Sequence, residues 1–92
     1  MLLADDFDKA FIGFGDRVGQ PRLAIYDKNN CIEILMNKHG MDMEEAIDYF
    51  MFNTEGAWVG EETPIFLNPM SLEDYTQLYE YKGYLNDNKK ET

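Results

Sequence analysis

The sequence predicts a small α+β domain with two or three short strands, an αα-hairpin and a C-terminal helix. Its length of 92 residues leaves room for one hydrophobic core. Its composition, 45% hydrophobic and 14% aromatic, is that of a folded chain and not of a disordered one. Apolar residues recur at helical spacing in some segments and form short runs bounded by Gly or Pro in others. We therefore expect a single domain over residues 1–92, with an irregular N-terminal segment at 1–20 and a frayed polar tail at 86–92.

The N-terminal segment contains aromatic residues at helical spacing. Phe7, Phe11 and Phe14 lie at i, i+4 and i+7, which predicts a short helix from about residue 5 to residue 14. The following glycine-rich run, GFGDRVG at residues 13–19, invites a nucleotide-binding interpretation. A phosphate loop, however, needs a strand before it and a helix after it, and here the order is reversed. We expect a structural loop; an enzyme that uses this loop together with Arg17 is the least favoured alternative.

A strand and a helix are predicted next. The run RLAIY at residues 22–26 has the composition of a strand. Asp27 or Asn30 caps the following helix by accepting a backbone N–H bond, and the helix runs to about Lys38. Gly40 then supplies the left-handed conformation in which helices commonly end.

A second helix is predicted to begin at Asp42, because Glu45 follows at the third position as in a capping box. It ends between Asn53 and Gly56. Its apolar stripe comprises Met43, Ala46, Ile47, Phe50 and Met51.

The chain after this helix is predicted to turn and extend. Residues 57–59 are compatible with a strand or a last helical turn, residues 60–63 with a turn, and residues 65–67 with a short strand introduced by Pro64. Ser71 and Asp74 predict the cap of a third helix, which Gly83 ends. We expect the helix pair on one face of the sheet and the third helix to complete the core, with parallel and antiparallel strand pairing both open.

The charge restricts the partners. Eighteen acidic residues against eight basic ones give a net charge of -10, which disfavours direct binding to nucleic acid. The two predicted central helices have the lengths of a helix-turn-helix, but the second carries Glu44, Glu45 and Asp48 and no Lys or Arg. The charge favours a protein partner with a basic surface, such as an enzyme channel that holds nucleic acid. The alternative is that the acids serve solubility alone.

The sequence contains no constellation that predicts catalysis, a metal or a cofactor. Cys31 is the single cysteine, so no disulfide forms within the chain, and a helical rise of about 12 Å separates it from His39, too far for a catalytic pair. The acids at positions 5, 6 and 8 lack the glycine and the twelfth-position glutamate of a calcium loop. We expect no enzyme activity, and Cys31 as a core residue. Without a signal peptide or a membrane span, we expect a cytoplasmic protein that does not bind membranes.

The aromatic residues are numerous for a small core. The chain has six Phe, six Tyr and one Trp, and Tyr and Trp often anchor protein interfaces. Trp58 lies beside a glycine-rich turn, and Tyr75, Tyr79, Tyr81 and Tyr84 gather near the C-terminus. The predicted partner-binding residues are Glu44, Glu45, Asp48, Trp58, Glu61 and Glu62.

Four motifs carry a resemblance to a known family. The runs CIEILM (31–36), HGM (39–41), EEAIDYF (44–50) and GAWVGEETPIF (56–66) resemble a family of small uncharacterised proteins encoded by phages and prophages. The resemblance covers about residues 19–67. It implies a phage-type origin, in which small acidic proteins often block host enzymes or defence systems, and it implies no reaction.

Together these observations predict a non-enzymatic, acidic, phage-type accessory protein. It is expected to bind and inhibit a host protein, either a defence enzyme or a nucleic-acid-handling enzyme, with mimicry of nucleic acid as one route. The alternative is a homo-oligomeric structural protein or a small-ligand-binding protein, with Trp58 and the Tyr-rich end forming the interface or pocket.

Overall fold

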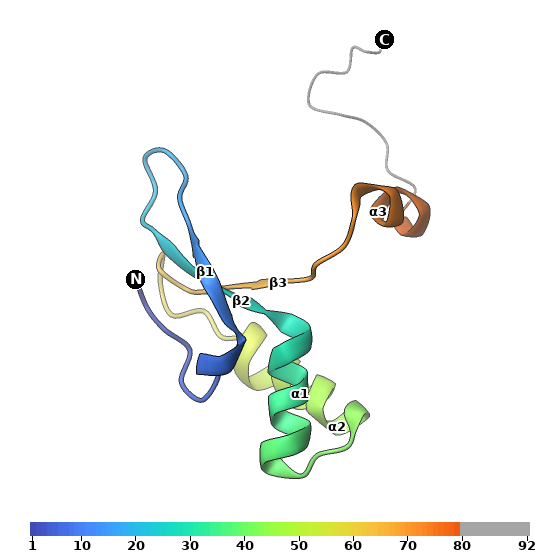
Figure 1. The fold of residues 1–92 in the computed structure, drawn as a ribbon. Coiled ribbons are helices and arrows are strands. Elements are labelled where there is room, and N and C mark those ends of the chain that lie inside the picture. The colour runs from blue at the N-terminus through green and yellow to red at the C-terminus, as the bar shows by residue number, and fades with distance from the viewer. Residues whose placement is uncertain (80–92) are drawn as a thin grey trace.

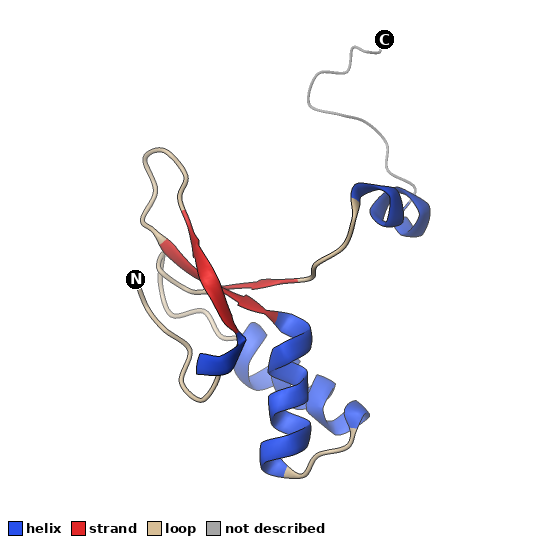
Figure 2. Ribbon diagram, in the orientation of Figure 1, coloured by secondary structure: helices blue, strands red, loops and turns tan. Residues whose placement is uncertain are grey.

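A computed structural model of the chain describes residues 1–79 and confirms the small α+β fold (Figures 1 and 2). A three-stranded sheet has the order β1-β2-β3, and a helix pair packs against it. The helices within residues 1–79 are too short and too polar to cross a bilayer. The elements, in chain order, are η1 (Asp8–Ala10), β1 (Phe11–Gly15), β2 (Leu23–Asp27), α1 (Lys28–His39), α2 (Met43–Phe50), η2 (Met51–Glu55), β3 (Ile65–Leu67) and α3 (Leu72–Tyr79).

The predicted N-terminal helix is wrong, because residues 11–15 form strand β1 after one 3-10 turn, η1. β1 pairs antiparallel with β2, placing Phe11 opposite Tyr26 and Phe14 opposite Ala24. The register shifts between Phe11 and Gly13, and Gly13 has φ +147°. Because of this β-bulge, Phe11 and Phe14, three apart in sequence, lie on the same face of the sheet as Tyr26 and Ala24. Helical spacing in the sequence therefore arises from a bulged strand.

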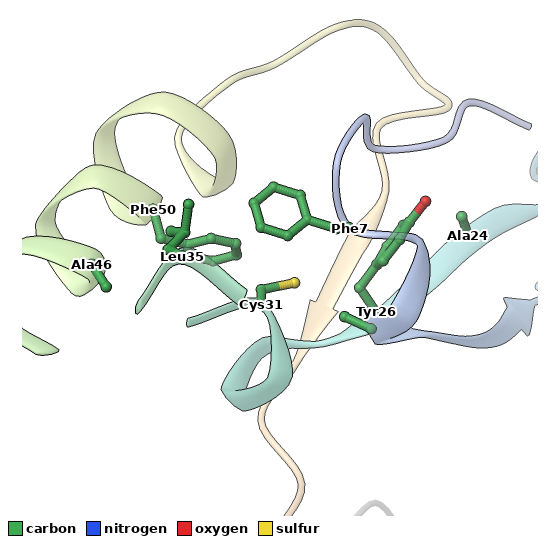
Figure 3. Close-up of a cluster of buried hydrophobic side chains, with 8 residues drawn as sticks. Phe7, Ala24, Tyr26, Cys31, Leu35, Ala46 and Phe50 are labelled. Atoms are coloured by element: carbon green, nitrogen blue, oxygen red, sulfur yellow. The ribbon is translucent and has the colours of Figure 1, made fainter. Parts of the chain in front are cut away.

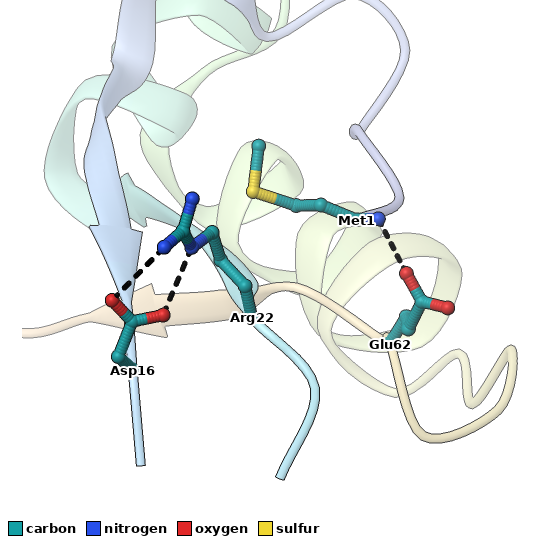
Figure 4. A network of polar contacts seen from close by, with 4 residues as sticks. All are labelled: Met1, Asp16, Arg22 and Glu62. Carbon is teal, nitrogen blue, oxygen red and sulfur yellow. Dashed lines mark hydrogen bonds and ion pairs between the residues drawn. The ribbon is translucent and has the colours of Figure 1, made fainter. Parts of the chain in front are cut away.

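The glycine-rich run forms part of β1 and the connection to β2, so it is a structural loop of an antiparallel hairpin. Arg22 holds the base of this loop, because its Nε donates to Oδ1 of Asp16 at 2.9 Å (Figure 4). Its guanidinium carbon also lies 4.2 Å from the centroid of the Phe14 ring. A phosphate loop would need a helix after the turn, and here a strand follows.

Local capping defines the helix pair as predicted. The Asp27 carboxylate accepts the Asn30 N–H at 3.0 Å at the start of α1, and Gly40, with φ +70°, ends that helix. Asp42 and Glu45 form a reciprocal capping box on α2, with N···O distances of 2.8 and 3.1 Å. The helical backbone continues through η2 to Glu55, inside the predicted range.

The helix pair connects β2 to β3, which lie parallel in the sheet. Ile25 lies opposite Ile65, Tyr26 opposite Phe66 and Asp27 opposite Leu67. A parallel pair needs a long crossover, and the helices provide it. The open question of strand direction is thereby settled.

The core lies between the helix pair and one face of the sheet (Figure 3). Phe50 of α2 is fully buried and meets the rings of Phe7 and Phe66 edge to face, with centroids 6.0 and 5.0 Å apart. Such aromatic pairs add to the stabilisation from burial. The cluster comprises Phe7, Ala10, Ala24, Tyr26, Cys31, Leu35, Ala46 and Phe50.

Helix α3 does not complete the core, contrary to the prediction. Its cap forms as expected, with Ser71 Oγ accepting the Asp74 N–H at 3.0 Å. Leu72 and Leu78, however, are 57% and 65% exposed, and the core cluster includes no residue of α3. The reason is that residues 68–71 carry the chain past the end of β3 instead of back over the sheet (Figure 1). The predicted helix end at Gly83 and the tail at 86–92 lie outside the described residues.

Candidate protein-binding surface

The outward side of α2 carries two carboxylates and a large aromatic ring. Glu44, Asp48 and Phe52 follow one another at four-residue intervals along continuous helical backbone, so neighbouring members lie on one side of it. All three are exposed, and Phe52 is 81% exposed. Neither carboxylate forms an ion pair with another residue of the range 1–79. We call these three residues the α2 face.

Glu45 has a different role from its neighbours. Its Oε1 accepts the Asp42 N–H at 3.1 Å in the capping box. A carboxylate engaged in this way stabilises the start of α2. Glu45 therefore contributes negative charge near the α2 face, but its geometry is set by the helix.

Trp58 lies on the loop between η2 and β3 and is 75% exposed. Thr63 fixes the shape of this loop, because its hydroxyl donates to the Gly60 carbonyl at 2.6 Å and accepts the Val59 N–H at 2.9 Å. Gly60 has φ +107°, a conformation that side chains disfavour. Trp58 and the 58%-exposed Val59 are thus presented by a hydrogen-bonded turn of defined shape.

The two predicted glutamates of this loop differ. Glu61 is exposed and forms no ion pair with another described residue. Glu62 pairs with the amino group of Met1 (Figure 4). We call Trp58, Val59 and Glu61 the loop face.

Four of the six predicted residues belong to two faces, Glu44 and Asp48 to the α2 face and Trp58 and Glu61 to the loop face, whereas Glu45 and Glu62 belong to neither. In Figure 1 the loop before β3 and helix α2 lie on opposite sides of η2. An apolar cleft of about 560 Å³ lies beside the loop, where Tyr49 of α2 and Val59 both line it. Its remaining wall comes from the N-terminal segment, α1, η2 and β3. Phe52 is the exposed aromatic that the sequence prediction missed, although its spacing from Glu44 and Asp48 on the helix indicates it.

Charge is unevenly distributed along the chain. Residues 40–79 contain nine acidic residues and no Lys, Arg or His. Residues 1–39 contain six acidic and five basic residues. Both faces belong to the acidic part, so a basic partner meets attraction there with no cation nearby in sequence to oppose it.

The residues considered for catalysis are far from a reactive arrangement. Cys31 is fully buried, and burial raises the pKa of its thiol from 9.0 to about 12, so the nucleophilic thiolate is scarce at neutral pH. His39 ends α1, and its Nε2 lies 3.6 Å from Oδ2 of Asp6. Lys38 also donates to Asp6 at 3.0 Å, and this contact lowers the pKa of the Asp6 carboxyl. Cys31 is the core residue that the sequence predicts.

A second, polar cleft of about 850 Å³ lies between the N-terminal segment and α1. Asp5, Asp6, Asp8 and Glu33 line it, but Lys9 and Lys38 line it too. In the range 1–79, no group of three or more His, Cys, Asp or Glu side chains is arranged to hold a metal ion.

The chain was compared with protein-family models, with curated proteins and with solved structures. None matches.

The chemistry that the surface supports is therefore read from the chain itself. The α2 face combines two carboxylates with the exposed Phe52 ring, and the loop face combines one carboxylate with the exposed Trp58 ring. Aromatic anchors near carboxylates suit a binding surface for a basic protein.

Proposed function

We propose that this chain is a non-catalytic binding protein of phage type that docks on a basic surface of a host protein and inhibits it. The favoured target class is an enzyme that handles nucleic acid, whose basic channel the acidic surface would occupy. A defence enzyme of the host belongs to this class when it acts on nucleic acid.

The observation that carries the proposal is the segregation of charge together with exposed aromatics. Nine carboxylates and no cation lie within residues 40–79. Glu44 and Asp48 are separated by about 6 Å of helical rise, so the α2 face presents two negative charges about one helical turn apart. Phe52 and Trp58, at 81% and 75% exposure, would supply apolar contacts that a surface built only for solubility does not need.

A displacement assay tests the proposal. Proteins from a bacterial lysate are retained on DNA-cellulose at low salt, and the purified chain is then added. We expect release of a defined host protein that co-purifies with the chain, whereas polyglutamate at matched charge does not release it. Raising the salt concentration should weaken the complex, since the acids steer association.

Matched variants locate the contact. Glu44→Gln/Asp48→Gln should weaken capture, whereas Glu73→Gln/Asp74→Gln removes the same charge from α3 and should not. Trp58→Ala should weaken binding by about thirtyfold, the effect of losing an anchor worth about 2 kcal/mol. The proposal is wrong if no protein is released at low salt, or if release by polyglutamate equals release by the chain.

The apolar cleft favours a second candidate function, binding of a small apolar ligand. Its volume of about 560 Å³ falls in the range of ligand sites, and His39, Tyr49 and Asn53 add polar groups to an apolar wall. An apolar fluorescent dye, anilinonaphthalene sulfonate, should bind in this cleft, and Ala57→Trp should block it. Dye binding that Ala57→Trp leaves unchanged would exclude the cleft as the site.

A further inference from the structure

The sheet has a second face that no described helix covers. Leu23 and Ile25 of β2 point away from the core, since they alternate with the buried Ala24 and Tyr26. Ile65, opposite Ile25 in the register, extends this face onto β3. The open face carries four apolar residues, Leu23, Ile25, Ile65 and Leu67, and none of these belongs to the core cluster or packs against it. Asp27, opposite Leu67 in the register, lies on the same face at its edge.

The open face is shallow and apolar. Gly13 and Gly15 of β1 lie opposite Ile25 and Leu23 and add no side chains. The Ile25 side chain leans over β1, with Cδ1 3.0 Å from the point where a Cβ on Gly15 would stand. Ile65 and Leu67 remain 42% and 41% exposed.

Parallel strand pairs are normally covered on both faces, and their strands then read as continuous apolar runs. β2 and β3 are such a pair, and LAIY and IFL are such runs. The core covers only the side of Tyr26 and Phe66. The apolar sequence of these strands therefore predicts that another element packs on the open face.

Helix α3 has the complementary property. Its described part has eight residues, and an isolated helical segment of that length is marginal in water. Leu72, Tyr75 and Leu78 follow one another at three-residue intervals, and their side chains are 57%, 41% and 65% exposed. Helices this short obtain their stability by packing an apolar face against another surface.

We propose that α3 of one copy packs on the open face of a second copy, and that the exchange is reciprocal in a two-fold dimer. The four-residue link 68–71, which spans at most about 14 Å, carries α3 beyond the end of its own β3 (Figure 1). A two-fold exchange covers both helices and both sheet faces at once and closes the assembly. The four apolar residues of the open face carry no charge, and the Asp27 carboxylate at its edge is engaged in capping α1, so two acidic chains can meet over the apolar part. The dimer does not rest on the proposed host partner, which uses other faces.

Self-association is tested by light scattering over a wide range of concentration. The wild-type chain should dimerise, and Ile65→Lys and Leu78→Lys should each weaken dimerisation at least tenfold. Both substitutions lower the net negative charge, so added repulsion between acids cannot explain the loss. Phe52→Lys is the matched control on the α2 face and should leave dimerisation unchanged. Circular dichroism verifies that each variant is folded.

Cysteine cross-linking distinguishes exchange from folding back. Ile65→Cys and Leu78→Cys chains, one carrying a size tag, are mixed and oxidised; Cys31 is buried and does not compete. A cross-linked heterodimer on a non-reducing gel supports the exchange. A wild-type chain that stays monomeric overturns it. A single chain that carries both cysteines provides the second test. If it forms the cross-link only within itself, the exchange is overturned, because α3 then covers the sheet of its own chain.

Discussion

Phe50 and Phe52 have the same side chain two positions apart and opposite roles. Phe50 is fully buried between the rings of Phe7 and Phe66, whereas Phe52 is 81% exposed. Phe50→Ala should lower the free energy of unfolding by about 3–5 kcal/mol, since it leaves a cavity in the core. Phe52→Ala should change it by less than about 0.5 kcal/mol. Urea denaturation measures both; equal losses would contradict the assignment of the core.

Cys31 makes stability depend on pH in the alkaline range. Its thiol is neutral in the folded chain, with a pKa raised from 9.0 to about 12 mainly by burial. The unfolded state therefore loses this proton first, and stability falls as pH rises from about 9 to about 12. Cys31→Ala should show a smaller fall over the same range, measured by urea denaturation at each pH. An equally steep fall in Cys31→Ala would assign the pH dependence to other groups.

Burial of Cys31 also predicts its reactivity. At neutral pH the folded chain should react slowly with a thiol reagent, and the denatured chain quickly.

At the scale of the element, the start of helix α2 depends on the side chain of Asp42. Asp42 Oδ1 accepts the Glu45 N–H at 2.8 Å, and the Asp42 N–H donates to Glu45 in return. Asp42→Ala should lower the free energy of unfolding by about 1 kcal/mol, the usual effect of losing an N-cap. Asp48→Ala removes the same charge from the helix interior without touching the cap and should have little effect. Thermal unfolding of the two variants makes the comparison, and equal shifts would exclude a specific capping effect.

Elements that local chemistry defines were predictable from the sequence. The caps at Asp27, Gly40 and Asp42 act within a few residues, so the sequence pattern determines the ends of α1 and the start of α2. β1 was not predictable, because its identity depends on pairing with β2 and on the bulge before Gly13. The position of α3 likewise depends on tertiary packing, which an apolar stripe alone does not specify.

The candidate surface shows the same division. Helical periodicity places Glu44 and Asp48 together on α2, as the sequence indicates. Trp58 lies on the loop between η2 and β3 and not on the helix that carries these acids, and the sequence does not give the path of that loop, which Figure 1 shows. The pairing of Glu62 with the Met1 amino group joins residues far apart in the chain and was equally hidden.

For the whole molecule, the segregated charge predicts how salt affects stability. Nine acids lie within residues 40–79, and no cation lies among them in sequence. Glu55 pairs with Lys28 and Glu62 with the Met1 amino group, whereas the other seven form no ion pair with another residue of the range 1–79 and repel one another in the folded state. The ion pairs Arg22–Asp16 and Lys38–Asp6 are exposed, and Lys28–Glu55 and Met1–Glu62 are partly exposed, so each contributes little and screening them costs little. Screening of the repulsion should dominate as the Debye length falls from about 30 Å at 0.01 M to about 10 Å at 0.1 M. The free energy of unfolding should therefore rise with sodium chloride, by an amount on the order of 1 kcal/mol.

A charge-removing variant shows whether the acidic segment is the cause of this salt effect. In Glu44→Gln/Asp48→Gln the rise should be smaller, because two of the nine acids of residues 40–79 are gone. Glu33→Gln lies in the part where acids and bases nearly balance, so its salt response should match that of the wild type. Urea denaturation at one fixed protein concentration, repeated across the salt series, gives the comparison. If the free energy of unfolding of the wild type falls with salt, the exposed ion pairs outweigh the repulsion between acids. The repulsion within the acidic segment would then be no argument for a basic partner.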